Sequence, residues 1–185
     1  MPNKHLEHPE DTILLSRRKC YQVVCTLLQE EISLGVKWDG APAVVCGINP
    51  DNDKFFVGTK SVFAKNAKIN YTKKDIANNH GTDDLGQKLL KCLVHIKKLN
   101  IQGVVQGDLL FTDEDITRKN IDGKPNLTFT PNTITYAVPE ASELGKQIDR
   151  AKVGMIFHTT YVGDALADMN AQGGADVRSF TKSND

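Results

Sequence analysis

The sequence predicts a single domain of the α+β class, with mainly antiparallel strands and flanking helices. Two stretches, residues 10–32 and 83–99, repeat apolar side chains at the spacing of amphipathic helices. The other apolar runs are short and are separated by Gly, Asn, Asp and Pro, which is typical of strands joined by turns. A chain of 185 residues can bury one core and is short for two, so we expect one domain.

The N-terminal part predicts a polar leader followed by one helix. The leader, residues 5–11, gathers imidazoles and carboxylates. It either handles a metal or phosphate, or simply precedes a helix that starts near Pro9. Residues 10–32 then form an amphipathic helix that docks on the core. The cations of residues 17–19 interrupt its apolar stripe, and they form a solvated face or contact a polyanion.

The central stretch, residues 33–47, predicts a β-hairpin. Apolar runs at Leu34–Trp38 and Ala43–Ile48 flank Asp39-Gly40, and an Asp-Gly pair in this setting is a strong hairpin signal. Lys37 then lies at the end of a strand, directly beside a tight bend. This arrangement presents an amine to a bound substrate.

The next segment predicts a strand over Phe55–Phe63, after a turn at residues 49–53. Lysines are frequent here, and no acidic residue lies between positions 54 and 74. These lysines are Lys54, Lys60, Lys65, Lys68, Lys73 and Lys74. Such a local excess of one charge favours contact with phosphate.

A lone carboxylate marks the strand predicted at residues 103–111. Asp108 interrupts an apolar run, and a charge in a buried strand is costly unless a partner is present. Two explanations stay open: Asp108 serves a site, or it lies at a solvent-accessible strand end. The helix before it, residues 83–99, is structural, and the polar residues 112–126 predict an exposed loop.

The C-terminal part predicts strands and a short helix before a loose tail. The expected strands are residues 127–130, 133–138 and 152–161, the last being the final strand, and the helix is residues 140–150. From Gly163 onward, small and polar residues dominate. We therefore assign the domain to residues 1–162 and a poorly ordered tail to residues 163–185.

Composition limits the classes of partner and location. The chain carries 23 basic and 23 acidic residues, so any affinity for nucleic acid must come from local patches. The four cysteines form no CxxC pair and have no histidine at metal-ligand spacing, which indicates reduced, mostly buried thiols. No apolar run approaches the roughly 18 residues of a membrane span, so we expect a cytoplasmic protein with no membrane association.

Lys37-Trp38-Asp39-Gly40 matches the KxDG signature of the covalent nucleotidyltransferases, the superfamily of ATP-dependent DNA ligases, RNA ligases and mRNA capping enzymes. The chain resembles this superfamily over residues 33–161, in the order of its lysine, basic, carboxylate and aromatic motifs. The resemblance implies a ligase-type adenylation core that uses ATP and Mg²⁺ and acts on DNA or RNA. It implies that Lys37 forms lysyl-AMP for transfer to a polynucleotide 5′-phosphate.

The resemblance also implies roles for other residues. Trp38, Asp39 and Gly40 would shape the lysine turn around the nucleotide, with Gly40 letting the backbone approach the phosphates. Asp108, in Gln106-Gly107-Asp108, would bind the nucleotide or the metal. The remaining assignments are Lys60 as a ribose or phosphate contact, Lys65 as its rival, and Phe157 as the residue that stacks on the base.

The chain departs from the family pattern in three places. Lys60 stands where the family usually has arginine, which removes a bidentate contact. Gln106 precedes the glycine of the carboxylate motif, and the shorter Asp108 follows it. The last two adenylation motifs have no counterpart after Tyr161, so we expect a truncated core.

The amino-acid sequence is also similar to those of a group of ligase-like proteins of tailed phages. The similar segments are His5-Leu6-Glu7-His8, Phe55–Ser61, Gln106–Asp108, Phe129–Tyr136 and Phe157–Tyr161. This similarity implies the cytoplasm of a phage-infected bacterium. Two alternatives to a ligase remain open: a non-catalytic nucleotide- or nucleic-acid-binding module, and a capping-type guanylyltransferase.

Overall fold

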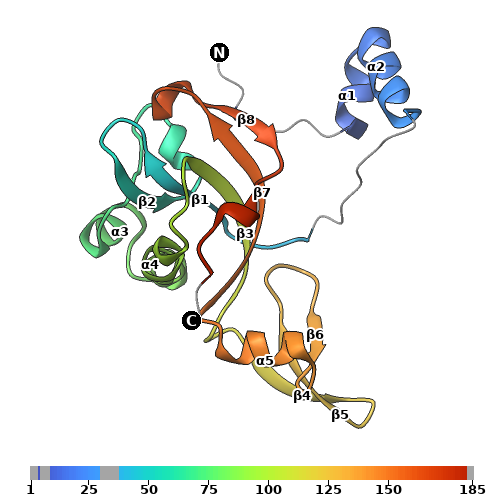
Figure 1. The fold of residues 1–185 in the computed structure, drawn as a ribbon, viewed down its shortest axis with the longest axis vertical. Coiled ribbons are helices and arrows are strands. Elements are labelled where there is room, and N and C mark those ends of the chain that lie inside the picture. The colour runs from blue at the N-terminus through green and yellow to red at the C-terminus, as the bar shows by residue number, and fades with distance from the viewer. Residues whose placement is uncertain (1–3, 5–8, 30–37, 183–185) are drawn as a thin grey trace.

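A computed structural model describes residues 4, 9–29 and 38–182, with residues 9 and 10 in backbone only (Figure 1). The fold is α+β with antiparallel sheets and helices, as predicted. One sheet has five strands in the order β2-β1-β3-β7-β8, and the other has three in the order β4-β5-β6. In Figure 1, the long strands β3 and β7 extend from the first sheet toward the second.

The five-stranded sheet is organised around β3. Its strands are β1 (Ala43–Asn49), β2 (Lys54–Gly58), β3 (Val104–Thr112), β7 (Val153–Val162) and β8 (Asn170–Gly173). All nine residues of β3 are buried, and the polar side chains of Gln106, Asp108 and Thr112 are buried together with its apolar ones. The turn predicted at residues 49–53 joins β1 to β2, with Asp53 at a positive φ of 56°.

Two helices cover one face of this sheet. α4 (Asp84–His95), continued by η2 (Ile96–Leu99), confirms the helix predicted at residues 83–99. On its buried side, Leu89 and Cys92 pack with strand residues such as Val44 in one core cluster. α3 (Lys73–His80) was not expected from the sequence. It begins at a capping box. The Thr72 side chain accepts the Asp75 backbone N–H, and the Asp75 side chain accepts the Thr72 backbone N–H.

Leu89 offers a direct test of this core. Leu89→Ala is expected to lower the free energy of unfolding by about 2–5 kcal/mol, because the side chain is fully buried and its removal leaves a cavity. Val94→Ala is the control, since Val94 lies on the same helix with half of its surface exposed. Denaturant unfolding compares the two variants. Equal losses would contradict the packing described here.

The opposite face of the sheet packs against short elements. The strand predicted over Phe55–Phe63 ends earlier, at Gly58, because Thr59 caps the 3-10 helix η1 (Lys60–Phe63). η1 and η3 (Leu166–Asp168) contribute to a second core cluster on this face. Lys4 joins it, with its ammonium 4.8 Å from the ring centre of Phe63, and burial lowers its pKa.

The second sheet corrects the loop predicted at residues 112–126. Its elements are β4 (Thr117–Ile121), β5 (Lys124–Phe129) and β6 (Tyr136–Pro139), with α5 (Glu143–Arg150) packed beside them. Asp122 and Gly123 both have positive φ angles, 51° and 75°, as a type I′ hairpin turn requires. All five residues of β4 are exposed, so no apolar alternation reveals the strand.

The helix predicted at residues 10–32 is two helices over its described part. α1 (Pro9–Leu15) ends before Ser16, which has extended backbone angles and caps α2 (Arg17–Leu27) by accepting the Lys19 N–H. No residue of α2 is buried, so the predicted docking on the core is wrong for this helix. Residues 30–32 lie outside the described part.

The segment after Gly163 differs from the predicted loose tail. β8 pairs with β7, which is therefore not the final strand, and Leu166 and Met169 are buried. Further on, η4 (Val177–Ser179) leads to Phe180, whose ring meets that of Phe157 edge-on at 5.3 Å. Residues 163–182 thus belong to the fold.

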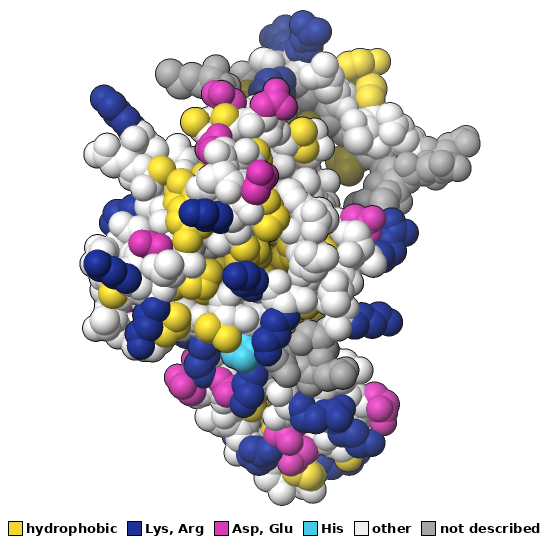
Figure 2. Space-filling view, turned by 60° about the vertical axis from the view of Figure 1, so that its left-hand side comes forward, with side chains coloured by type: hydrophobic (Ala, Val, Ile, Leu, Met, Phe, Trp, Pro, Cys, Tyr) yellow, Lys and Arg dark blue, Asp and Glu magenta, His cyan; other side chains and the backbone are white. Residues whose placement is uncertain are grey.

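Charges of both signs are mixed on the surface. Figure 2 shows one face on which Lys and Arg side chains lie among acidic and hydrophobic ones. Several lysines of this protein pair with acids, including Lys88 with Asp84 and Lys152 with Asp113. These pairs lie outside the lysine-rich segment at residues 54–74, on which the expected contact with phosphate rests.

Candidate functional site

The segment that carries the Asp-Gly of the lysine motif lies against β3. The Ala41 N–H donates to the Leu109 carbonyl, and the Leu109 N–H donates to the Pro42 carbonyl, both at 3.0 Å. A Cβ on Gly40 would stand 2.6 Å from the Leu109 oxygen and 3.0 Å from Asp108 Cβ. Close approach to β3 is therefore what requires glycine here, and it brings two predicted motifs into contact.

The described residues do not form the predicted two-residue hairpin turn at Asp39-Gly40. Neither Asp39 nor Gly40 has a positive φ, which the two-residue hairpin turns require. The nucleophile candidate Lys37 and the first strand of that hairpin, up to residue 37, lie outside the described residues, as do the imidazoles of residues 5–8.

Asp39 is held by Tyr136, the first residue of β6, and by Asn132 in the loop before it. The Tyr136 hydroxyl accepts the Asp39 N–H at 3.3 Å and lies 3.4 Å from the Asp39 carbonyl, to which it donates. The Asn132 side-chain amide donates to Asp39 Oδ2 at 2.8 Å. Trp38 packs on the Tyr136 ring with centroids 5.0 Å apart. The second sheet thus positions the motif that follows Lys37.

Asp108 is a buried carboxylate with a histidine beside it. Its Oδ1 lies 3.3 Å from His158 Nε2, and only 10% of its side chain is exposed. His158 is the extra residue where the pairing of β3 and β7 shifts register, because Gln106 faces Thr159 and Gly107 faces Phe157. Such bulges redirect a side chain. Sequence reasoning missed His158, and its position beside the predicted aromatic was the available signal.

Other buried polar groups line the same side of β3. Gln106 lies two residues before Asp108 and so faces the same way. Its Oε1 accepts the Tyr161 hydroxyl at 2.8 Å. Burial raises the pKa of Tyr161 to about 12, so the phenol keeps its proton and remains a donor.

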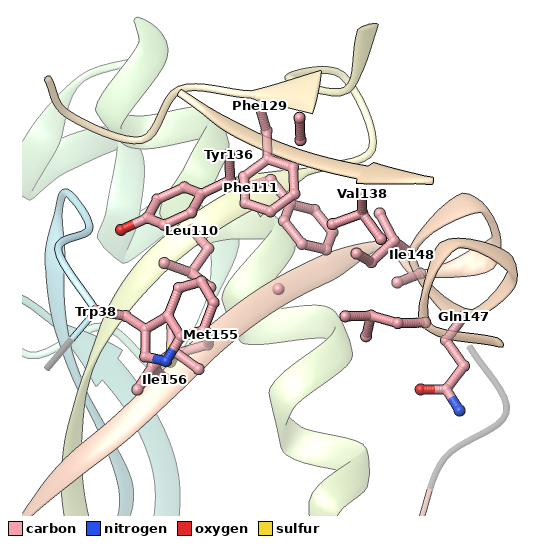
Figure 3. Close-up of a pocket in the computed structure, with 14 residues that line it drawn as sticks. Trp38, Leu110, Phe111, Phe129, Tyr136, Val138, Gln147, Ile148, Met155 and Ile156 are labelled. Carbon is pink, nitrogen blue, oxygen red and sulfur yellow. The ribbon is translucent and has the colours of Figure 1, made fainter. Parts of the chain in front are cut away.

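An apolar pocket adjoins this polar group. It has a volume of about 400 Å³ and lies between β3, β7, the second sheet and α5 (Figure 3). Aromatic rings form one wall: Tyr136 lies 5.5 Å from Phe129, and Phe129 lies 4.7 Å from Phe111. Ile156, which lines the pocket, is the direct cross-strand partner of Asp108. The pocket and the carboxylate are therefore neighbours.

Trp38 closes one end of the pocket, and among the described residues that line it only Gln147 has a side-chain amide. Figure 3 shows the Gln147 amide turned away from the cavity. The pocket is of the size that small-molecule sites have, and flat apolar groups suit its walls. The pocket walls are mostly apolar, and the carboxylates of Asp108 and Asp39 lie beside the pocket.

The other predicted site residues are not gathered there. Phe157 faces Gly107 across the β3–β7 pair and packs in the cluster under α4, on the side of the sheet opposite to Asp108. Lys60 is half-buried at the start of η1, an element on the Asp108 side of the sheet, and Lys65 is exposed in the loop that follows. The structure thus brings together the Asp39-Gly40 segment and Asp108, and it separates Phe157 from them.

A family model matches residues 3–185, which is almost the whole chain. The chain belongs to DUF6267, a family of unknown function. Comparisons with curated proteins and with solved structures gave no match. For this DUF6267 chain, function must be argued from the site itself.

Two further searches bear on partners and cofactors. Across residues 9–29 and 38–182, no helix has the length and apolarity needed to span a membrane. Within the same described residues, no three His, Cys, Asp or Glu side chains are grouped closely enough to hold a metal by themselves. An ion at Asp108 would need ligands from water or from a substrate, as Mg²⁺ at phosphate sites commonly has.

Proposed function

We propose that the chain is an ATP-dependent nucleotidyltransferase of the nucleic-acid ligase type, which forms lysyl-AMP at Lys37. One observation carries the proposal: the Asp39-Gly40 segment, which begins two residues after Lys37, packs directly on Asp108. The two segments resemble the lysine motif and the carboxylate motif of one enzyme family. Their contact is what a shared nucleotide site needs.

The pocket supplies a place for the base of ATP. Trp38 and the aromatic wall offer flat apolar surfaces, and base–aromatic stacking is favourable for any base. Asp108 lies at the edge of the pocket, because its cross-strand partner Ile156 lines the pocket. The ribose and phosphates of ATP would therefore extend toward Asp108. We therefore assign the stacking role to Trp38 in place of Phe157.

The proposed chemistry is a substitution at phosphorus. The neutral Lys37 amine attacks the α-phosphorus, an N–P bond forms, and the bond to the β-phosphate oxygen breaks. Pyrophosphate leaves with the electron pair, and the nitrogen loses a proton. A divalent ion held at Asp108 would neutralise charge on the phosphates. The acceptor would be a DNA or RNA 5′-phosphate, which then displaces Lys37 from AMP.

Labelling with α-³²P nucleotides tests the nucleotidyltransferase proposal. We expect covalent label from ATP with a divalent metal ion, and we expect unlabelled ATP to compete better than GTP. Preferred labelling by GTP would favour a guanylyltransferase. Binding of ATP without label would contradict the proposal and favour a non-catalytic module.

Trp38→Ala is expected to weaken ATP binding by about 5- to 150-fold, the effect of losing roughly 1–3 kcal/mol of stacking. Equilibrium dialysis with labelled ATP measures the affinity. Trp38→Phe, which keeps a ring, is the matched control and should retain most of it. Since Trp38 is the single tryptophan, quenching of its fluorescence by ATP is an independent check in the wild type. Unchanged affinity in Trp38→Ala would place the base elsewhere.

A further inference from the structure

Three buried imidazole nitrogens among the described residues have no hydrogen-bond partner: His80 Nε2, His95 Nδ1 and His158 Nε2. Burial lowers the pKa of His80 and of His95, and nearby lysines lower it further. Within the described chain, His158 is the one histidine with a carboxylate inside ion-pair distance. The buried Nε2 of His158 thus lacks a hydrogen bond although a carboxylate oxygen lies beside it, and a cation bound by both atoms would satisfy the nitrogen.

The geometry of the pair matches two ligands of one ion. His158 Nε2 and Asp108 Oδ1 are 3.3 Å apart. Two ligand atoms at about 2.1 Å from a metal, separated by a right or tetrahedral angle, lie roughly 3.0–3.4 Å apart. The two side chains come from neighbouring strands, and the Asp108 side chain is nine-tenths buried. Their separation is therefore set by the sheet.

A second contact orients the imidazole. His158 Nδ1 lies 2.8 Å from Thr159 Oγ1, and Thr159 is buried. When Nδ1–H donates to this hydroxyl, Nε2 carries its lone pair toward Asp108. Metal-bound histidines commonly hold their second nitrogen in this way, which fixes the ring and raises its affinity for the ion.

We propose that Asp108 Oδ1 and His158 Nε2 bind a divalent first-row transition-metal ion in preference to Mg²⁺. This inference rests on the proposed function, because it names the ion of that site. Mg²⁺ takes oxygen ligands almost throughout, whereas an imidazole nitrogen favours transition ions. The remaining positions on the ion would be filled by water and by phosphate oxygens of the nucleotide.

Mn²⁺ is the probe for this site. Titration of the full chain followed by electron paramagnetic resonance counts bound Mn²⁺, and electron spin-echo measurements detect a coordinated ¹⁴N. We expect one Mn²⁺ with nitrogen coupling, most of it retained in excess Mg²⁺. His158→Gln and Asp108→Asn should each weaken binding by about tenfold or more and remove or reduce the coupling. His80→Gln, the matched control, should leave both unchanged.

Thr159→Val keeps both ligands and removes the orienting hydroxyl, so it tests the site even if another variant fails to fold. It should weaken Mn²⁺ binding by about tenfold. Absence of bound Mn²⁺, bound Mn²⁺ without nitrogen coupling, or full binding by His158→Gln would each overturn the inference. Lysyl-AMP formation is scored separately. Label without an Mn²⁺ site would reject only the metal assignment, and an Mn²⁺ site without label would reject only the proposed function.

Discussion

Asp108→Asn is expected to slow lysyl-AMP formation by roughly 10²- to 10³-fold, the cost of removing one preorganised electrostatic group from a reaction site. The amide keeps the shape of the carboxylate, so its packing against Gly40 is retained. What is lost is the negative charge that would hold a cation beside the phosphates. The rate of label incorporation from α-³²P ATP measures the effect.

Asp113→Asn is the control for that variant. Asp113 follows β3 directly and pairs with Lys91 and Lys152, so it is a carboxylate near the same strand with structural partners. Its variant should label at close to the wild-type rate once folding is verified by circular dichroism. Equal rates for Asp108→Asn and wild type would remove Asp108 from the reaction.

Gly40→Ala is expected to abolish most labelling and to destabilise the fold. The new Cβ would meet the Leu109 carbonyl at 2.6 Å, a backbone atom that cannot rotate away, so the motif segment or β3 must shift. Overpacking of this kind costs about 1–3 kcal/mol. A displacement of about 1 Å at a reacting group costs on the order of 10²-fold in rate.

Gly173→Ala is the matched control for Gly40→Ala, because a Cβ there would meet no atom within 4 Å. It should change neither the unfolding midpoint nor the labelling rate. If Gly40→Ala labels as well as Gly173→Ala, the contact between the Asp39-Gly40 segment and β3 has no part in the reaction.

The dipeptide Asp-Gly occurs in two places in the structure with two different conformations, so the local sequence alone does not decide whether a hairpin turn forms. Asp122-Gly123 forms the hairpin turn, although the strand before it is exposed throughout and was expected to be a loop. Asp39-Gly40 was expected to form a hairpin turn and instead leads into a segment that lies alongside β3. Local propensity allows a turn at both places, and tertiary contacts decide which one forms it.

Elements with strong periodicity were predictable. β3 and α4 bury enough apolar surface to show it in the sequence, and both were placed close to their observed bounds. The break at Ser16 and the start of α3 depend on single caps, at Ser16 and Thr72, which are weaker signals than a run of apolar residues. The segment after Gly163 has few apolar residues, so its pairing with β7 was not visible.

The candidate site was predictable only in part, for a physical reason. Asp108 stood out because a charge interrupts an apolar strand. The Tyr136 and Asn132 contacts to Asp39 span more than ninety residues of sequence, so no local pattern announces them. The face on which Phe157 lies could not be predicted either, because adjacent strand residues alternate between faces and a bulge at His158 sets the register against Asp108.

The most direct test of the central claim is intact-protein mass spectrometry after incubation with ATP and a divalent metal ion. The account predicts that the wild-type chain gains the mass of one AMP and that peptide mapping places it on Lys37. Lys37→Ala should gain nothing, while Lys119→Ala, which removes an exposed lysine of β4, should still be adenylated. A wild-type chain that stays unmodified, or a Lys37→Ala chain that gains AMP as the wild type does, would contradict the account.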